Sequence, residues 1–375
     1  MRIDKSIIHV TAVVKRELSE GLISALKDAG FRYTNATAAR KIQLLQNKGP
    51  LKLFFGDQSL NDDSVQAITF FINKEAELPI LQYVIRSALL EIPGRGSVFS
   101  SEVKLISAHP ECMENRIEKL SSEKADKMLL AGLTGINCIV QKGEGDAVAR
   151  TGLDTGSGVP VITYGEGTGL RDKLGLWRIT IPAEKEIAQI VATPSDAKSL
   201  MEVMINAGGL DQPGKGFIYE FPVAHGLIDA QIHIGMASQA ASIEQIVTVL
   251  DEIKGGTDWR RRDFAYVQAG RRYLTELSAL TLVCNEGHGM DLVKAAMAAG
   301  AAGATVSKLK YIALTDVPES KISPAREKAE MIVGAGQVDA ITDALIKAGM
   351  LSDDICGLVY LSPVPRACTY LGKAK

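Results

Sequence analysis

The spacing of hydrophobic positions changes along the chain, and the same order of spacings recurs. Residues 7–14 are an apolar run rich in β-branched side chains, which is typical of a strand. Residues 17–29 then place Leu22 and Leu26 on one face of a helix that Gly30 would end. The further elements predicted in this segment are strands at 32–45, 65–72 and 96–106 and a helix at 78–90. The predicted order is βαββαβ.

This order returns twice more along the chain. In the second copy, strands are predicted at 136–140, 159–164, 186–192 and 216–223, with helices at 146–155 and 196–207. In the third copy, strands are predicted at 280–284, 304–314, 329–333 and 358–361, with helices at 290–299 and 338–348. A repeat of this length indicates three copies of one small domain.

A glycine-bearing turn joins the second helix to the last strand, and we call it the glycine hook. In the first two copies it reads Pro93-Gly94-Arg95-Gly96 and Pro213-Gly214-Lys215-Gly216. In the third copy, the alignment places Asp354 opposite Pro213, Ile355 opposite Gly214 and Cys356 opposite Lys215. Because an aspartate there would repel phosphate, we expect the third cleft to be structural or to take another ligand.

The repeat predicts the architecture. A βαββαβ unit forms a four-stranded antiparallel sheet with both helices on one face and an open opposite face. Three tethered copies can cover one another's open faces, so we predict an α+β protein of three tandem ferredoxin-like domains in a pseudo-threefold ring. Independent domains are the alternative, although neither linker is rich in Gly and Ser. The predicted divisions are domain 1 at 1–110, a helical linker at 111–132, domain 2 at 133–226, a helical linker at 227–276, and domain 3 at 277–375.

Composition narrows the partners and the compartment. The 375 residues suit two to three domains, and a net charge of −2 gives no general attraction to nucleic acid. The N-terminus lacks an apolar signal core, and no stretch approaches the ~20 apolar residues of a membrane span. The five cysteines and five histidines are dispersed, so we predict neither a disulfide framework nor a metal site. The expected location is the cytoplasm.

The second copy resembles the nitrogen-regulatory P-II signalling proteins and their P-II-like relatives. Four ordered segments carry the resemblance, namely residues 139–145, 165–169, 182–187 and 210–216. Four motifs in this order are more specific than any one of them. The first and third copies match by element order and fewer residues.

The resemblance implies a function. Members of that family are homotrimers that bind ATP or ADP in the clefts between subunits, and a long loop docks on a transporter, enzyme or regulator. It therefore implies a non-catalytic signal-transduction protein, a pseudo-trimer in one chain, that binds ATP or ADP and regulates a transporter or metabolic enzyme. In the family, the hook lysine and the lysine at the third strand contact phosphate. The cofactor-binding residues implied here are Gly165, Glu166, Gly167, Thr168, Gly169, Lys185, Pro213, Gly214, Lys215, Gly216, Gly94, Arg95 and Gly96.

The residues of the second hook fit anion binding independently of the resemblance. Glycines allow backbone N–H groups to approach an anion closely, and Lys215 would add a mobile positive charge. The alternative is that Pro-Gly-x-Gly is only a tight connection between a helix and a strand. Arg366, just past the last strand, could reach a neighbouring cleft or lie on the surface.

Two other function classes remain open at this point. One is a structural adaptor with empty clefts, and the other is an enzyme on the same scaffold. The sequence contains no Ser/His/Asp grouping and no Walker-type Gly-Lys-Ser/Thr motif. We therefore predict no catalytic residues. The longest candidate docking loop is 46–64, and it contains no tyrosine that could be modified.

Overall fold

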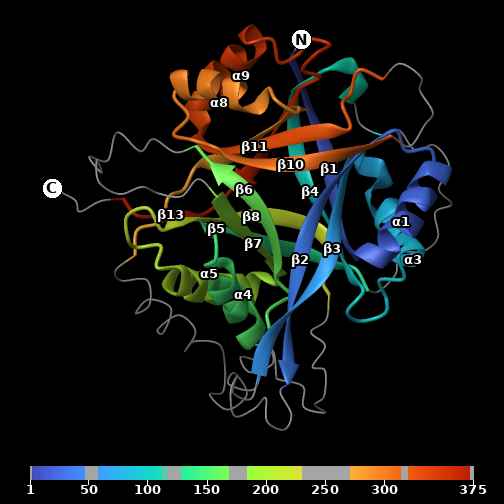
Figure 1. Cartoon of the computed structure of the whole chain (residues 1–375), viewed down its shortest axis with the longest axis vertical. Coiled ribbons are helices and arrows are strands. Elements are labelled where there is room, and N and C mark those ends of the chain that lie inside the picture. Colours follow the sequence, from blue (N-terminus) through green and yellow to red (C-terminus); the bar gives the residue numbers. More distant parts are fainter. Residues whose placement is uncertain are drawn as a thin grey trace.

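The structure is a computed structural model that describes residues 2–46, 58–112, 115, 128–168, 184–229, 271–313 and 320–371. Its strands form one sheet of 13 strands, in which a closed antiparallel β-barrel of 10 strands carries additional strands. The helices lie outside the strands in three pairs, α1 with α3, α4 with α5, and α8 with α9 (Figure 1). None of the described helices is long and apolar enough to cross a membrane.

The elements follow one another in three similar series. The first contains β1 (Arg2–Lys15), α1 (Arg16–Asp28), β2 (Tyr33–Gln46), β3 (Gln58–Ile72), α3 (Glu77–Ser87) and β4 (Gly96–Ala108). The second contains β5 (Leu130–Gln141), α4 (Gly145–Asp154), β6 (Val161–Gly167), β7 (Glu184–Ala192), α5 (Pro194–Gly208) and β8 (Gly216–Leu227). The third contains β9 (Leu277–Asn285), α8 (Gly289–Ala298), β10 (Thr305–Ala313), β11 (Ala325–Gly334), α9 (Val338–Lys347), β12 (Leu358–Val364) and β13 (Ala367–Thr369). Short 3-10 helices lie at Lys74–Ala76, Pro110–Cys112 and Ala335–Gln337.

The prediction of three tandem ferredoxin-like domains in a pseudo-threefold ring is wrong. The strand order is β10-β11-β9-β12-β4-β1-β3-β2-β6-β7-β5-β8-β13, with further pairings β10–β2, β10–β6 and β4–β8. The sheet therefore passes from one series into the next without a break, so no series has a sheet of its own. The physical reason is that the N–H and C=O groups of a sheet edge need partners, and each series supplies them to its neighbour. Backbone pairing between the series closes the molecule.

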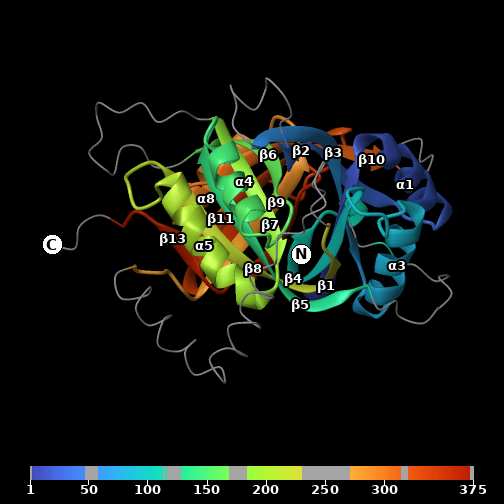
Figure 2. The same ribbon diagram turned by 90° about the horizontal axis from the view of Figure 1, so that it is seen from below.

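Residue alternation along the strands determines which side faces the barrel interior. In β1, Val10 and Ala12 are buried in the cluster under α1 and α3, whereas the alternating residues His9 and Thr11 line the interior. Side chains on a strand alternate between its two faces, so one strand contributes to both regions. Similar apolar clusters lie under the other two helix pairs. Figure 2 shows the helix pairs outside the strands from a second direction.

Local signals determine where helices begin and end. Thr193 caps the start of α5, because its side chain accepts a hydrogen bond from the Asp196 backbone N–H, and Pro194 occupies the first turn. Gly209 follows the last residue of the helix and ends it in the left-handed conformation, with φ of 59°.

The predicted linkers and docking loop fall mostly on residues that the structure does not describe. β5 begins inside the predicted linker 111–132, and β8 ends at Leu227, the first residue of the predicted linker 227–276. The predicted loop 46–64 is shorter than expected on one side, because β3 begins at Gln58 and pairs with β2 from there. Residues 47–57 of that loop lie outside the described residues.

Candidate functional site

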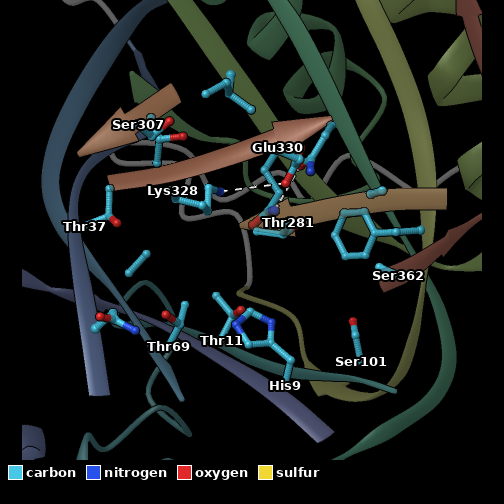
Figure 3. Close-up of a pocket in the computed structure, with 18 of the residues that line it drawn as sticks. His9, Thr11, Thr37, Thr69, Ser101, Thr281, Ser307, Lys328, Glu330 and Ser362 are labelled. Atoms are coloured by element: carbon cyan, nitrogen blue, oxygen red, sulfur yellow. Dashed lines mark hydrogen bonds and ion pairs between the residues drawn. The ribbon is translucent and has the colours of Figure 1, made fainter. Parts of the chain in front are cut away.

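A cavity of about 160 Å³, lined by both polar and apolar side chains, lies in the middle of the barrel. Strands β1 to β12 all contribute residues to its lining, and Figure 3 shows ten of these side chains labelled around it. Much of the lining consists of hydroxyl and amide side chains, among them Thr11, Thr37, Thr69, Thr163, Thr281, Asn35, Ser101 and Ser307. A barrel interior filled for stability alone is lined by bulky apolar side chains, so the polar side chains in this mixed lining are informative.

Three lining atoms have no hydrogen-bond partner within the described part of the chain. They are Asn35 Oδ1, Ser101 Oγ and Ser307 Oγ. Their residues are only 3%, 5% and 4% exposed, respectively. Because a buried polar group without a partner destabilises the folded state, such atoms normally bind water or a ligand. These three atoms have almost no accessible surface of their own, so a small polar molecule in the cavity could bind them only after their side chains turn toward it.

Two charged side chains enter the cavity from β11. Lys328 and Glu330 lie two residues apart on the same face of the strand, and Lys328 Nζ lies 3.9 Å from Glu330 Oε2. The Tyr219 hydroxyl donates a short hydrogen bond to Glu330 Oε1. Burial, followed by the charge of Glu330, raises the pKa of Tyr219 well above its ordinary value, so the hydroxyl remains a donor.

The Tyr219 hydroxyl is itself positioned by two amides. Asn137 Nδ2 donates to the Tyr219 oxygen at 2.7 Å, and Gln189 Nε2 donates to Asn137 Oδ1 at 3.0 Å. This chain of hydrogen bonds runs across β7, β5 and β8 and ends on Glu330 of β11. It fixes one oxygen of the Glu330 carboxylate and leaves the other facing Lys328.

His9 adds an aromatic wall that stays uncharged. Its ring lies 5.0 Å from the Phe71 ring and 5.4 Å from the Tyr360 ring, measured between centroids. Burial, and to a lesser degree the charge of Lys328, lower the pKa of His9 to about 3. Besides this uncharged imidazole, the ionisable lysine and carboxylate side chains of the described lining are Lys328 and Glu330.

The first glycine hook is occupied by a side chain of the protein. Gly94 has φ of 80°, and its N–H donates to Asp229 Oδ1 at 2.8 Å. Lys41 Nζ donates to Gly94 O at 2.6 Å and to Asp229 Oδ2 at 2.9 Å. The Lys41 and Asp229 side chains are 1% and 5% exposed. The Asp229 carboxylate thus takes the contacts that we expected an external anion to make at Gly94, in the hook that also contains Arg95 and Gly96.

The second hook holds its lysine beside a carboxylate. Lys215 Nζ lies 2.7 Å from Glu144 Oε1, and the Lys215 side chain is 37% exposed. Gln141 Nε2 donates to Gly214 O at 3.0 Å, and Thr369 Oγ1 donates to Gly216 O at 2.8 Å. Pro213 lies in the same turn. The ammonium group of Lys215 is therefore accessible, although the carboxylate of Glu144 partly balances its charge.

The predicted glycine segment after the second strand lies away from this hook. Gly165 pairs with Lys185 of β7, Lys185 with Gln141 of β5, and β5 in turn with β8. Since neighbouring strands lie about 4.8 Å apart, three strand spacings, about 14 Å, separate Gly165 from the hook.

The same segment is joined to the third series. Glu166 pairs with Val306 and Gly167 with Thr305, while the Thr168 N–H donates to Ala304 O at 2.8 Å. A Cβ at Gly165 would lie 2.9 Å from Ser307 Oγ and from the Val306 carbonyl oxygen, so close packing against β10 explains this glycine. Gly169 lies outside the described residues. Among the described residues, Gly165 to Thr168 therefore lie apart from the second hook and against β10.

The third hook keeps the turn but not the predicted alignment. The Ile355 N–H donates to Ser352 O, as Lys215 does to Gln212 O and Arg95 to Ile92 O. Ile355 therefore corresponds to Lys215, and Asp354 to Gly214.

A buried arginine lies beside this hook. Arg326 donates to Asn285 Oδ1 at 2.6 Å and to Cys356 O at 2.9 Å, and it is completely buried. The expectation that Asp354 aligns with Pro213, Ile355 with Gly214 and Cys356 with Lys215 is wrong by one residue.

Arg366 binds a carboxylate of the chain. Its Nη2 lies 2.5 Å from Glu220 Oε1, and its guanidinium lies 4.7 Å from the centre of the Tyr273 ring. This contact holds β13 against β8.

Sequence reasoning did not find the central cavity. Its lining comes from twelve strands, each of which contributes isolated polar residues between buried apolar ones. The only local signal is a threonine or serine at inward positions of strands, as at Thr11, Thr69 and Thr281. Within the described residues, no group of three or more His, Cys, Asp or Glu side chains is placed to hold a metal ion.

Comparisons with known proteins add no family. No family model matches the chain, and no similar protein is found among the curated proteins. The resemblance to the P-II-like proteins therefore stays a prediction.

Proposed function

We propose that the chain is a non-catalytic binding protein whose barrel holds a small polar molecule in its central cavity. One observation carries this proposal: three buried polar atoms without described partners, on Asn35, Ser101 and Ser307, line the same cavity as the charged side chain of Lys328. A ligand with hydrogen-bonding groups could satisfy these atoms once their side chains turn toward it.

The volume of the cavity limits the ligand. One water molecule occupies about 30 Å³ of the liquid, so 160 Å³ corresponds to about five waters or one molecule of similar volume. Sites for drug-sized ligands measure about 300–1,000 Å³. A nucleotide is therefore too large for this cavity. Binding of ATP or ADP stays a prediction for the second hook, where Lys215 is accessible.

The state of the reactive side chains supports binding without catalysis. All five cysteines are free and buried, and burial raises the pKa of each thiol, so the reactive thiolate form is disfavoured. His9 stays neutral well below pH 7 and cannot serve as an acid there. The carboxylate of Glu330 is already engaged with Tyr219. Regulation of a transporter or metabolic enzyme stays a prediction.

A cavity-filling variant tests the proposal. We expect small polar compounds to raise the melting temperature of the natural chain, because a ligand that binds only the folded state stabilises it. In Ser101→Leu, the new side chain would occupy the cavity and remove this response. The matched control is Ser64→Leu, since Ser64 lies exposed on β3. Melting temperatures measured with glycerol, acetate, alanine and phosphate would show the effect.

A second measurement covers a ligand that the panel lacks. The purified protein would be denatured, and released small molecules would be identified by mass spectrometry in the natural chain and in Ser101→Leu. A compound carried only by the natural chain supports the proposal. Equal responses in the two proteins, or no response and no released compound in either, would contradict it.

A further inference from the structure

The two charges in the cavity form a loose pair rather than a closed one. The 3.9 Å between Lys328 Nζ and Glu330 Oε2 exceeds the length of a charge-assisted hydrogen bond, which is about 2.7–2.9 Å. The side chains of Lys328 and Glu330 are 34% and 16% exposed. Both charged groups therefore keep accessible surface, and Figure 3 shows their side chains next to each other on β11.

The balance of charge indicates which molecule fits. A ligand with only a negative charge would gain the ammonium of Lys328 but would meet the carboxylate of Glu330 in the same small space. A ligand with only a positive charge would meet the opposite problem. When the ligand carries a charge opposite to each of the two side chains, neither side chain is left without a partner. A molecule with adjacent positive and negative charges satisfies both residues.

We propose that the cavity binds a small zwitterion of the α-amino acid class, with its carboxylate on Lys328 and its ammonium on Glu330. The two charges of an α-amino acid are attached to one carbon, and the two charges of the cavity are likewise neighbours on β11. This inference rests on the proposed function of the cavity. The cavity volume, equal to about five waters, limits the ligand to the smallest members, such as glycine, alanine and serine.

The remaining polar atoms suit the rest of such a ligand. Ser101 Oγ and Ser307 Oγ can each donate or accept a hydrogen bond, and Asn35 Oδ1 can accept one. A ligand hydroxyl, as in serine, has the same dual capacity. Tyr219 holds one oxygen of Glu330 and leaves the other for an ammonium group.

The α-amino-acid class is tested by calorimetric titration of the full chain at pH 7 with compounds of similar size that carry or lack each charge. L-Alanine carries both charges, propionate lacks the ammonium, ethylamine lacks the carboxylate, and glycerol is neutral. We expect alanine to bind at least about tenfold more tightly than each of the others, because each missing charge loses one charge-assisted hydrogen bond. Equal or tighter binding of propionate, ethylamine or glycerol would overturn the amino-acid class and leave the cavity as a binding site. Binding of none of these compounds, together with no compound released on denaturation, would remove the proposed function as well.

Charge-removing variants distinguish recognition from a structural role. In Lys328→Met we expect alanine to lose at least about tenfold in affinity and ethylamine to bind better than propionate. In Glu330→Gln we expect the reverse order, with propionate preferred, while the amide oxygen can still accept from Tyr219. Lys294→Met, on the exposed face of α8, is the control. Loss of affinity without this exchange of preference would contradict direct contact of the two charges with the ligand.

Discussion

At the scale of single residues, the most informative contact is the buried pair of Lys41 and Asp229. The pair joins β2, the first hook and the residues that follow β8. The hook was recognisable from its glycines, and its capacity to hold an anion is used in the structure. Sequence reasoning could not name the anion, because Asp229 lies 135 positions from Gly94. A contact between residues so distant in sequence leaves no local pattern.

Removal of one partner of this pair gives a residue-scale prediction. Asp229→Ala leaves the Lys41 ammonium buried without its counter-charge, which costs about 3–5 kcal/mol in the free energy of unfolding. Glu102→Ala breaks the exposed Lys74–Glu102 pair and should cost less than about 1 kcal/mol. Urea denaturation followed by circular dichroism measures both. Equal losses in the two variants would mean that the buried pair carries no special stability.

At the scale of elements, local periodicity predicted most helices and strands, and polar positions caused the errors. The third strand of the last series was predicted at 329–333 but begins at Ala325. Its first residues include Arg326 and Glu327, which are buried because their side chains bind residues of other elements. Glu327 Oε2 accepts from the Gly289 N–H at 2.8 Å, and Arg326 binds Asn285. Such partners are fixed by the fold and cannot be read from the strand itself.

The hook glycines give an element-scale prediction. Gly216 has φ of 155°, and a Cβ there would lie 2.1 Å from the Ile139 carbonyl oxygen, so the close pairing of β5 with β8 excludes any side chain. Gly216→Ala should cost about 2 kcal/mol or more in the free energy of unfolding. Gly21→Ala, inside α1 with open space around it, should stabilise the protein by about 0.5–1 kcal/mol. Chemical denaturation of both variants tests this. Tolerance of alanine at position 216 would show that the turn can relax.

At the scale of the whole molecule, the sequence revealed a threefold repeat of elements but not how the repeats join. Each series could bury its apolar faces by docking as a finished domain or by sharing its sheet edges, and the sequence pattern is the same in both cases. The pairings of β2 with β6 and of β12 with β4 show that the series share one sheet. The central cavity exists only because the inner faces of all series meet in one interior. It therefore could not be predicted from any single copy.

A continuous sheet should unfold as one cooperative unit, which gives a prediction for the whole chain. Val359 lies fully buried on β12 and faces Ser107 of β4 and Leu282 of β9, so Val359→Pro removes a backbone donor where two series join. We expect faster amide hydrogen exchange in β1 and β5 as well as in β9, measured by mass spectrometry of peptides. The control is Leu371→Pro, at an exposed position near the C-terminus, which should change exchange only locally. If Val359→Pro accelerated exchange in β9, β11 and β12 alone, the three series would behave as separate folding units joined by weak pairings. The cavity between them would then open without global unfolding, and a ligand could enter and leave through the β12–β4 junction.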